Sequence, residues 1–271
     1  HPNILSVFLL AALLALTACE TRAPRPDSAR TEPVATVGPA EKAEQGGEYV
    51  LAAREYEGLA KLATSPQRQH YELKAVESLI KAGQAREARE RLRVVDVAKL
   101  DAPFQARKRI HEAQLAVLED RPDEALRLLA QAEKTSNLNP ALFAEIHRVR
   151  AQAEIAIEYP LSAIKSLIAR EKYIAARDVV AKNQQLLWQV LATLSRAQLE
   201  QEIKIARDPI LIGWLELGIN ALENSGSRAS LANAVDAWRK THPLHPASEE
   251  VLKTIALSRP ERMGMVERIA L

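Results

Sequence analysis

Histidine side chains are the first candidates for metal binding or catalysis in this sequence. The six histidines are His1, His70, His111, His147, His242 and His245. None of them forms the pair four residues apart, with a neighbouring glutamate, that a zinc site on a helix requires. Two imidazoles that flank the proline-rich turn at 242–246 can share a metal, but a structural role in the turn is the better interpretation. We therefore expect no metal site.

Motifs for other kinds of catalysis are also missing from the sequence. There is no glycine-rich phosphate-binding loop, and Ser225-Gly226-Ser227 is typical of a helix terminator. No Gly-x-Ser-x-Gly motif occurs, and no Ser-x-x-Lys motif has a second motif to act with. Asp and Glu together number 35, so pairs of carboxylates arise by chance and do not indicate a catalytic site. The sequence predicts a protein that is not an enzyme and needs no cofactor.

Cys19 is the single cysteine, which excludes an internal disulfide and a cysteine-cluster metal site. Residues 4–16 form a nearly unbroken apolar run that is short for a membrane span and typical of a secretory signal. The segment Leu16-Thr17-Ala18-Cys19 resembles the lipobox of bacterial lipoproteins. In a lipobox the chain is cleaved just before the cysteine, which here is the bond between Ala18 and Cys19, and the cysteine is lipidated on sulfur. The alternative is an ordinary signal peptide with an incidental cysteine.

A proline-rich segment follows the cysteine. Residues 19–45 contain four prolines among polar residues and show no helical period. Such a segment stays extended at roughly 3 Å per residue, so we predict a disordered linker after a signal peptide over residues 1–18. The residue after the cysteine is Glu20 rather than the aspartate that retains enterobacterial lipoproteins at the inner membrane. This favours a lipid anchor in the outer membrane, on its periplasmic side.

Composition and charge restrict the class of protein further. The 271 residues are 47% hydrophobic and 4% aromatic, with nine glycines and many Glu, Ala, Arg and Leu residues. This composition is typical of an all-α protein. The 37 basic and 35 acidic residues nearly cancel, and no concentrated basic face is visible, which argues against nucleic-acid binding.

The helical part of the sequence contains a repeat. A small alanine recurs at intervals of 36, 37 and 38 residues, and a large residue follows each alanine four positions later. The alanines are Ala52, Ala88, Ala125 and Ala163, and the large residues are Tyr56, Leu92, Leu129 and Leu167. This pattern resembles the tetratricopeptide repeat (TPR), in which stacked helical hairpins build a solenoid. We therefore predict a TPR-like all-α domain over residues 46–258, with these residues packing the hairpins together.

The turn of each hairpin is predicted five residues before its alanine. These positions are Gly47, Gly83, Asp120 and Glu158, so the glycine typical of the repeat is present in two of four. The Trp-Leu-Gly-Tyr features of the first repeat helix are mostly absent. The repeats are thus degenerate, and generic antiparallel helices with chance spacing are the alternative.

The repeat fades beyond residue 172, where further helices are predicted. Their approximate ranges are 183–194, 195–206, 210–222, 231–240 and 248–257. Ser195 and Gln198 predict a capping box at the start of the second of these helices. The tryptophans Trp188, Trp214 and Trp238 are predicted to lie in the core, with a position facing a partner as the alternative.

Several segments of this region carry a family resemblance. They are Asn183-Gln184-Gln185-Leu186-Leu187-Trp188, the segment 208–217 with Gly213 and Trp214, and the segment 238–247 with Trp238, His242, Pro243, His245 and Pro246. With the lipobox and the repeats, they resemble the amino-terminal half of the LpoA family. This family comprises outer-membrane lipoproteins that activate a bifunctional class A penicillin-binding protein. Residues 259–271 resemble the linker and the start of the family's second domain, an α/β fold similar to periplasmic binding proteins. We expect further sequence before His1 and after Leu271.

The resemblance implies a function in peptidoglycan synthesis. A family member anchored in the outer membrane crosses the periplasm and stimulates cross-linking by the synthase in the inner membrane. The synthase contact is attributed mainly to the second domain. This helical half is then a spacer or docking surface, with its concave face as the candidate docking site and peptidoglycan as a second candidate partner.

Two alternatives remain open from the sequence. One is a self-contained TPR lipoprotein of the outer-membrane β-barrel assembly machinery. The other is a helical superhelix that precedes a lytic transglycosylase domain, which requires a catalytic glutamate downstream of this chain.

Overall fold

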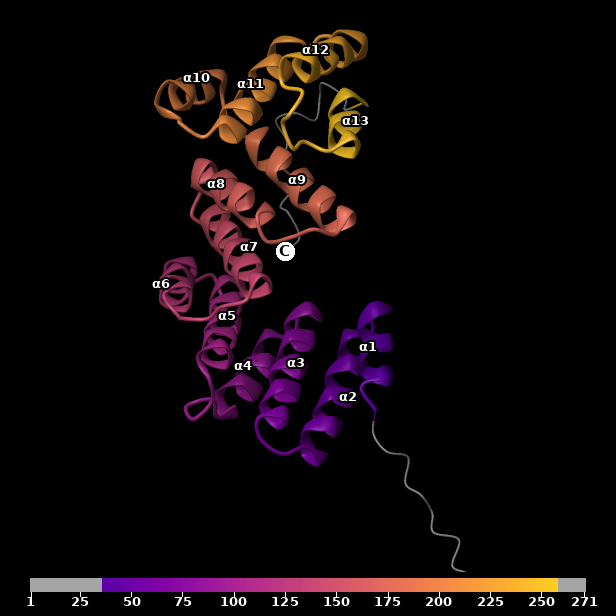
Figure 1. Ribbon diagram of the computed structural model, residues 1–271, viewed down its shortest axis with the longest axis vertical. Coiled ribbons are helices and arrows are strands. Elements are labelled where there is room, and N and C mark those ends of the chain that lie inside the picture. The colour runs from indigo at the N-terminus through magenta and orange to yellow at the C-terminus, as the bar shows by residue number, and fades with distance from the viewer. Residues whose placement is uncertain (1–35, 258–271) are drawn as a thin grey trace, which may run out of the picture. The chain divides into compact units, whose positions relative to one another are not determined.

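Helices account for all of the regular secondary structure in residues 36–257, the part of the chain that the computed structural model describes (Figure 1). No strand occurs in this range. The all-α class predicted from composition is therefore confirmed. Each helix in residues 36–257 is either too short or too polar to cross a lipid bilayer.

The first eight helices form four successive hairpins (Figure 1). The hairpins are α1 (Gly38–Gln45) with α2 (Tyr49–Leu62), α3 (Gln67–Lys81) with α4 (Ala85–Val94), α5 (Ala102–Leu118) with α6 (Pro122–Glu133), and α7 (Pro140–Ala156) with α8 (Pro160–Glu171). The first helices of neighbouring hairpins also pack together, since α5 contacts both α3 and α7. This arrangement confirms the TPR-like architecture predicted from the repeat.

Helix α1 corrects the predicted boundary of the helical domain. It lies inside residues 19–45, for which the sequence predicts a disordered linker. Ala40 and Ala43 are buried in one apolar cluster with Ala52 and Tyr56 of α2, and Pro39 occupies the first helical turn, where proline is tolerated. The linker was predicted from the four prolines of residues 19–45, but the last eight residues of this segment form a helix. The predicted lipidation and cleavage sites, and the predicted start of a second domain, lie outside the described residues.

The repeat residues lie in the core between the hairpins. The four alanines Ala52, Ala88, Ala125 and Ala163 are 0% exposed. The large residues that follow them, Tyr56, Leu92, Leu129 and Leu167, are at most 3% exposed. A methyl side chain lets two helices approach closely, and the large side chain one turn later fills the space beside it.

The four hairpin turns share one backbone conformation. Their φ angles are +75° at Gly47, +73° at Gly83, +57° at Asp120 and +58° at Glu158. The residue after each turn position donates its N–H to the carbonyl five residues earlier, for example Tyr159 to Glu154 at 2.8 Å. This is the Schellman motif, which ends a helix with a left-handed residue. Glycine adopts this conformation without strain, whereas aspartate and glutamate do so at a cost.

Glu158→Gly is therefore expected to raise the free energy of unfolding by about 1 kcal/mol, since it relieves the left-handed strain of a residue with a side chain. Gly83→Ala is expected to lower it by a similar amount, of order 1 kcal/mol. Urea unfolding monitored by circular dichroism measures both changes. Gly58→Ala is the control for replacing glycine by alanine where the backbone is not left-handed. Gly58 lies inside α2, and an added Cβ at this position meets no atom within 4 Å. A less stable Glu158→Gly protein would contradict the prediction.

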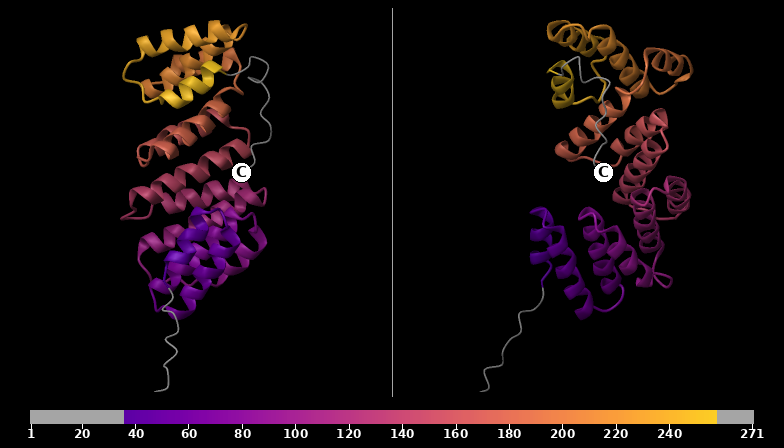
Figure 2. Two further views of the ribbon diagram at one scale, coloured as in Figure 1. Left: turned by 90° about the vertical axis from the view of Figure 1, so that its right-hand side faces the viewer. Right: turned by 180° about the vertical axis from the view of Figure 1, so that it is seen from behind.

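Five further helices follow the hairpins. They are α9 (Arg177–Leu191), α10 (Arg196–Ile205), α11 (Pro209–Glu223), α12 (Arg228–Thr241) and α13 (Glu249–Leu257). Helix α9 begins earlier than the predicted residue 183. The capping box of Ser195 and Gln198 at the start of α10 is confirmed. Helices α11, α12 and α13 pack in sequence, and α13 also contacts α9 (Figure 2).

Candidate docking surface

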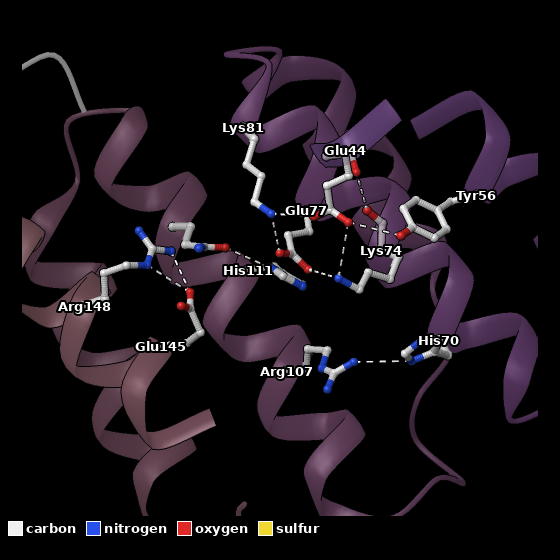
Figure 3. A network of polar contacts seen from close by, with 12 residues as sticks. Glu44, Tyr56, His70, Lys74, Glu77, Lys81, Arg107, His111, Glu145 and Arg148 are labelled. Carbon is white, nitrogen blue, oxygen red and sulfur yellow. Dashed lines mark hydrogen bonds and ion pairs between the residues drawn. The ribbon is translucent and has the colours of Figure 1, made fainter. Parts of the chain in front are cut away.

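A polar groove crosses the first helices of three successive hairpins (Figure 3). It is lined by Tyr49 of α2, by Glu77, Ile80 and Lys81 of α3, by Gln114, Val117 and Leu118 of α5, and by Glu145, Arg148 and Gln152 of α7. Glu77, Gln114 and Gln152 lie 37 and 38 residues apart, so they occupy equivalent positions in the three hairpins. The repeat that packs the core therefore also aligns polar side chains on one face.

An ion-pair network joins α1 and α3 at one side of the groove (Figure 3). The Oε2 atom of Glu77 lies 3.3 Å from Lys74 Nζ, and its Oε1 atom lies 2.8 Å from Lys81 Nζ. Lys81 Nζ also lies 2.6 Å from Glu44 Oε1, and the Tyr56 hydroxyl donates to Glu44 Oε2 at 3.1 Å. Because Lys74, Glu77 and Lys81 are spaced three and four residues apart, one face of α3 carries all three charges.

The two lysines keep Glu77 ionised. Burial alone raises the pKa of this carboxyl, but the charges of Lys74 and Lys81 outweigh burial and lower the pKa of Glu77 to about 2. Burial, together with the neighbouring Glu44, raises the pKa of Tyr56 to about 12. The network therefore holds a constant charge at neutral pH.

Helices α5 and α7 supply hydrogen-bonding side chains to the groove. His111 is 5% exposed, and its Nδ1 atom lies 2.8 Å from Gln114 Oε1. Burial lowers the pKa of His111, so the ring is neutral and its Nδ1–H donates to this amide oxygen. On α7, Arg148 donates through Nε and Nη2 to Glu145 Oε2 and through Nη1 to Gln152 Oε1. Each glutamine amide oxygen is thus occupied by a neighbour.

Stability is expected to decline as the pH falls below about 6.5, the ordinary pKa of histidine. Burial lowers the pKa of His70, His111, His147 and His245 in the folded chain. The unfolded chain then binds more protons below this pH, so the free energy of unfolding decreases as the pH drops through the folded pKa values. A second loss follows below pH 4.5, where the unfolded carboxyl of Glu77 protonates before the folded one.

Urea unfolding at pH values from 8 to 4 measures this dependence. His111→Gln is expected to reduce the slope between pH 6.5 and 5, because one of the buried imidazoles is then absent. A free energy of unfolding that stays constant between pH 7 and 5 would rule out the histidine contribution.

The motif residues between Trp238 and Ala247 form a second polar cluster, which we call the brace. Trp238 Nε1 donates to Gly213 O at 2.9 Å, and His245 Nε2 donates to Ile210 O at 2.9 Å. The Nδ1 atom of His245 accepts from Ala247 N at 3.2 Å. Trp238 is 1% exposed and His245 is 8% exposed. The brace therefore links α12 and the following loop, which contains Pro243 and Pro246, to α11.

Ring packing completes the brace. His242 stacks on Trp238 with ring centroids 5.0 Å apart, and its Nε2 atom lies 2.8 Å from Glu216 Oε2. Trp214, which is 0% exposed, meets the His245 ring edge-on at 5.3 Å. A Cβ on Gly213 would lie 2.5 Å from His245 Cδ2, so only glycine leaves room for this ring. The motif residues thus contact one another in a structural cluster.

Helix α9 is tied to the brace through one buried amide. Gln184 is 0% exposed, its Oε1 accepts from Ser248 N at 2.8 Å, and its Nε2 donates to Pro246 O at 3.0 Å. Trp188, 7% exposed, lies in the same apolar cluster as Trp214 and Trp238. All three tryptophans are therefore core residues.

Sequence reasoning did not select the residues of the polar groove. Charged and amide side chains on a helix are usually solvent-exposed, and no catalytic or binding motif marks them. One signal was available, because Glu77, Gln114 and Gln152 recur at the spacing of the packed alanines. Among residues 36–257, no group of three His, Cys, Asp or Glu side chains is placed to hold a metal ion.

The hairpins, their common turns and the aligned groove define a TPR-like helical repeat protein. A family model described as LppC putative lipoprotein matches residues 51–263. This match covers most of the chain, and the chain belongs to this family.

Curated relatives carry the name penicillin-binding protein activator LpoA. The relative from Glaesserella parasuis serovar 5 (strain SH0165) is 27% identical over 188 residues, which cover 67% of this chain and 31% of the relative. The relative from Dickeya chrysanthemi (strain Ech1591) is 24% identical over 252 residues, which cover 93% of this chain and 34% of the relative. The chain thus spans about a third of the length of these proteins.

Solved structures show the same fold. The amino-terminal domain of E. coli LpoA matches with a TM-score of 0.65 at 19% identity, covering 76% of this chain and 91% of that domain. LpoA from Haemophilus influenzae matches with a TM-score of 0.66 at 19% identity, covering 76% of this chain and 38% of that protein. The resemblance to the amino-terminal half of the LpoA family, inferred from the sequence motifs, is confirmed.

Proposed function

We propose that this chain is the helical half of a non-catalytic outer-membrane lipoprotein that activates a class A penicillin-binding protein. The observation that carries the proposal is the LppC family match over residues 51–263, joined to relatives that share the name penicillin-binding protein activator. Because the chain spans about a third of those relatives, the activation itself is proposed for the extended protein that contains this chain.

The proposed anchor is a lipidated Cys19 on the periplasmic side of the outer membrane. The apolar run before Cys19 and the small residues next to it support this assignment. Cys19→Ser is expected to leave a soluble or uncleaved protein, because the acyl chains that hold a lipoprotein are then missing. Phase partitioning in Triton X-114 measures the difference. Equal detergent-phase partitioning of mutant and wild type would exclude the lipid anchor.

The proposed contribution of the helical half is docking through the polar groove. Three successive hairpins present repeat-equivalent side chains there, and extended surfaces of this kind are what helical repeats use for binding. The charged side chains that line the groove are already fixed by ion pairs and hydrogen bonds, so they do not need to reorganise when a partner binds.

Charge reversal in the groove tests this contribution. Lys81→Glu and Arg148→Glu in the extended protein are expected to raise the concentration needed to stimulate the synthase about tenfold, which equals about 1.4 kcal/mol. Arg86→Glu is the matched control, because Arg86 lies on α4 with a 94% exposed side chain. Cross-linking by the purified penicillin-binding protein is the readout, with circular dichroism to check folding. Unchanged stimulation by both groove variants would refute the docking contribution.

The alternative of a self-contained lipoprotein of the β-barrel assembly machinery is not favoured by the names of the relatives. Immunoblots of envelope fractions with antibody against residues 46–258 separate the two functions. A native outer-membrane protein near twice the 30.0 kDa of this chain supports the activator. A protein near 30.0 kDa would support the assembly-machinery alternative.

A further inference from the structure

Arg107 of α5 is a half-buried cation that has no carboxylate partner among residues 36–257 (Figure 3). Its nearest polar contact is the ring of His70, where Arg107 Nη1 lies 3.4 Å from His70 Nδ1. The carboxylates Glu44, Glu77 and Glu145 around the groove are each paired with another lysine or arginine. A guanidinium without a counterion in partial burial indicates a place for an external anion.

The position of Arg107 places it on the groove face of α5. It lies seven residues, about two helical turns, before Gln114, so both side chains project from the same face. The same seven-residue offset relates Glu145 to Gln152 on α7. His70, Arg107 and Glu145 are themselves 37 and 38 residues apart and occupy equivalent positions in the three hairpins. Arg107 therefore belongs to a second row of repeat-equivalent side chains beside the first.

On and beside these two rows, the hydrogen-bond donors that remain free outnumber the free acceptors, and positive charges outnumber negative ones. The amide oxygens of Gln114 and Gln152 accept from His111 and Arg148. In the described part of the chain, the NH2 groups of both glutamines make no hydrogen bond and remain available as donors. Lys74, Lys81, Arg107 and Arg148 provide four positive charges against the three carboxylates. The ligand that complements this surface is rich in acceptors and negatively charged.

We propose that the polar groove, together with Arg107 beside it on α5, binds an extended acidic segment of a protein partner. A carboxylate of the segment pairs with the Arg107 guanidinium, whose planar fork fits a carboxylate with two hydrogen bonds. Backbone carbonyls of the segment accept from the amides of Gln114 and Gln152. These glutamines lie on packed helices, whose axes are typically about 8–10 Å apart, and about three residues of extended chain span the same distance. The inference rests on the docking contribution proposed above.

Peptide selection tests the proposal directly. The purified full-length protein, its Arg107→Gln variant and its Arg109→Gln variant are each used to select from a random dodecapeptide display library. Arg109→Gln is the matched control, because it removes the same charge from the same helix, but Arg109 lines a different pocket together with Asp96 and Glu112. We expect wild type and Arg109→Gln to enrich peptides with Asp and Glu, and Arg107→Gln to lose this enrichment.

Binding constants of the selected peptides complete the test. Fluorescence anisotropy is expected to show at least tenfold weaker binding to Arg107→Gln, and a similar loss when the acidic residues of the peptide become Asn and Gln. Circular dichroism should give the same melting temperature for all three proteins. Selection without acidic enrichment, or equal binding by wild type and Arg107→Gln, would overturn the proposal.

Two further assays distinguish an acidic peptide ligand from a cell-wall ligand, and peptide binding from activation of the synthase. If Arg107→Gln loses co-sedimentation with purified peptidoglycan sacculi while peptide selection is unchanged, the groove is a cell-wall site and the proposal is overturned. If Arg107→Gln loses peptide binding but still stimulates the synthase, the acidic-segment site stands and activation depends on another surface. If Lys81→Glu no longer stimulates the synthase but the wild-type protein does not enrich acidic peptides, the proposed docking function stands. Only the inference of an acidic-segment site is then overturned.

Discussion

Trp238→Ala is expected to lower the free energy of unfolding by about 3–5 kcal/mol. The indole is 1% exposed, so its removal leaves a cavity between α11 and α12 that the rigid neighbours fill only in part. The carbonyl of Gly213 also loses its hydrogen bond from Trp238 Nε1. His242 loses the ring on which it stacks. Urea unfolding with linear extrapolation measures the change.

Two companion variants separate the contributions of the brace. Trp238→Phe keeps most of the ring packing and removes the N–H, so its cost should be the smaller, about 1–3 kcal/mol. Gly213→Ala places a methyl group where His245 lies and should cost about 1–3 kcal/mol through overpacking. Lys240→Ala, at an exposed site on the same helix, is the control. If Trp238→Ala unfolds at the same urea concentration as this control, the brace does not stabilise the domain.

Gln184→Leu is expected to lower the free energy of unfolding by about 2–4 kcal/mol, because two partly buried backbone groups and the Glu171 carboxylate lose a hydrogen bond, at about 1–3 kcal/mol for each group left without a partner. Leucine has a similar volume, so the change isolates hydrogen bonding from packing. The N–H of Ser248 and the carbonyl of Pro246 lose the partner that holds this loop against α9. Tryptophan fluorescence during urea unfolding reports the loss, since Trp188 lies on the same helix.

Gln185→Leu provides a neighbouring comparison. Gln185 is exposed on α9, so its replacement should change the free energy of unfolding by no more than about 0.5 kcal/mol. Gln184→Glu should be at least as destabilising as Gln184→Leu, because a carboxylate buried at this position would face both Pro246 O and the carboxylate of Glu171, to which Gln184 Nε2 donates in the wild type. A Gln184→Leu protein as stable as Gln185→Leu would show that the hydrogen bonds of this amide contribute nothing measurable.

Local features of the helical domain were predictable because their signals lie within a few residues. The turn positions adopt the left-handed conformation even where glycine is replaced by Asp120 and Glu158. The alanine five residues after each turn is buried in every hairpin. The capping box of α10 needs only Ser195 and Gln198, which are three residues apart. Helix α1 was missed because its prolines outweighed the short helix-forming stretch, and its burial against α2 is a tertiary contact.

The sequence by itself determined the helical class, the repeat with its turns, most of the helices beyond α8 and the family, since periodicity and motifs act over short distances along the chain. Only the tertiary structure decided which side chains meet across helices. Arg107 contacts His70 at a separation of 37 residues, and Gln184 contacts Ser248 at a separation of 64. A helical period indicates which face of a helix a residue occupies, but the neighbour opposite that face depends on how separate helices pack. The polar groove and the brace are therefore set by the packing of helices that are distant in the sequence.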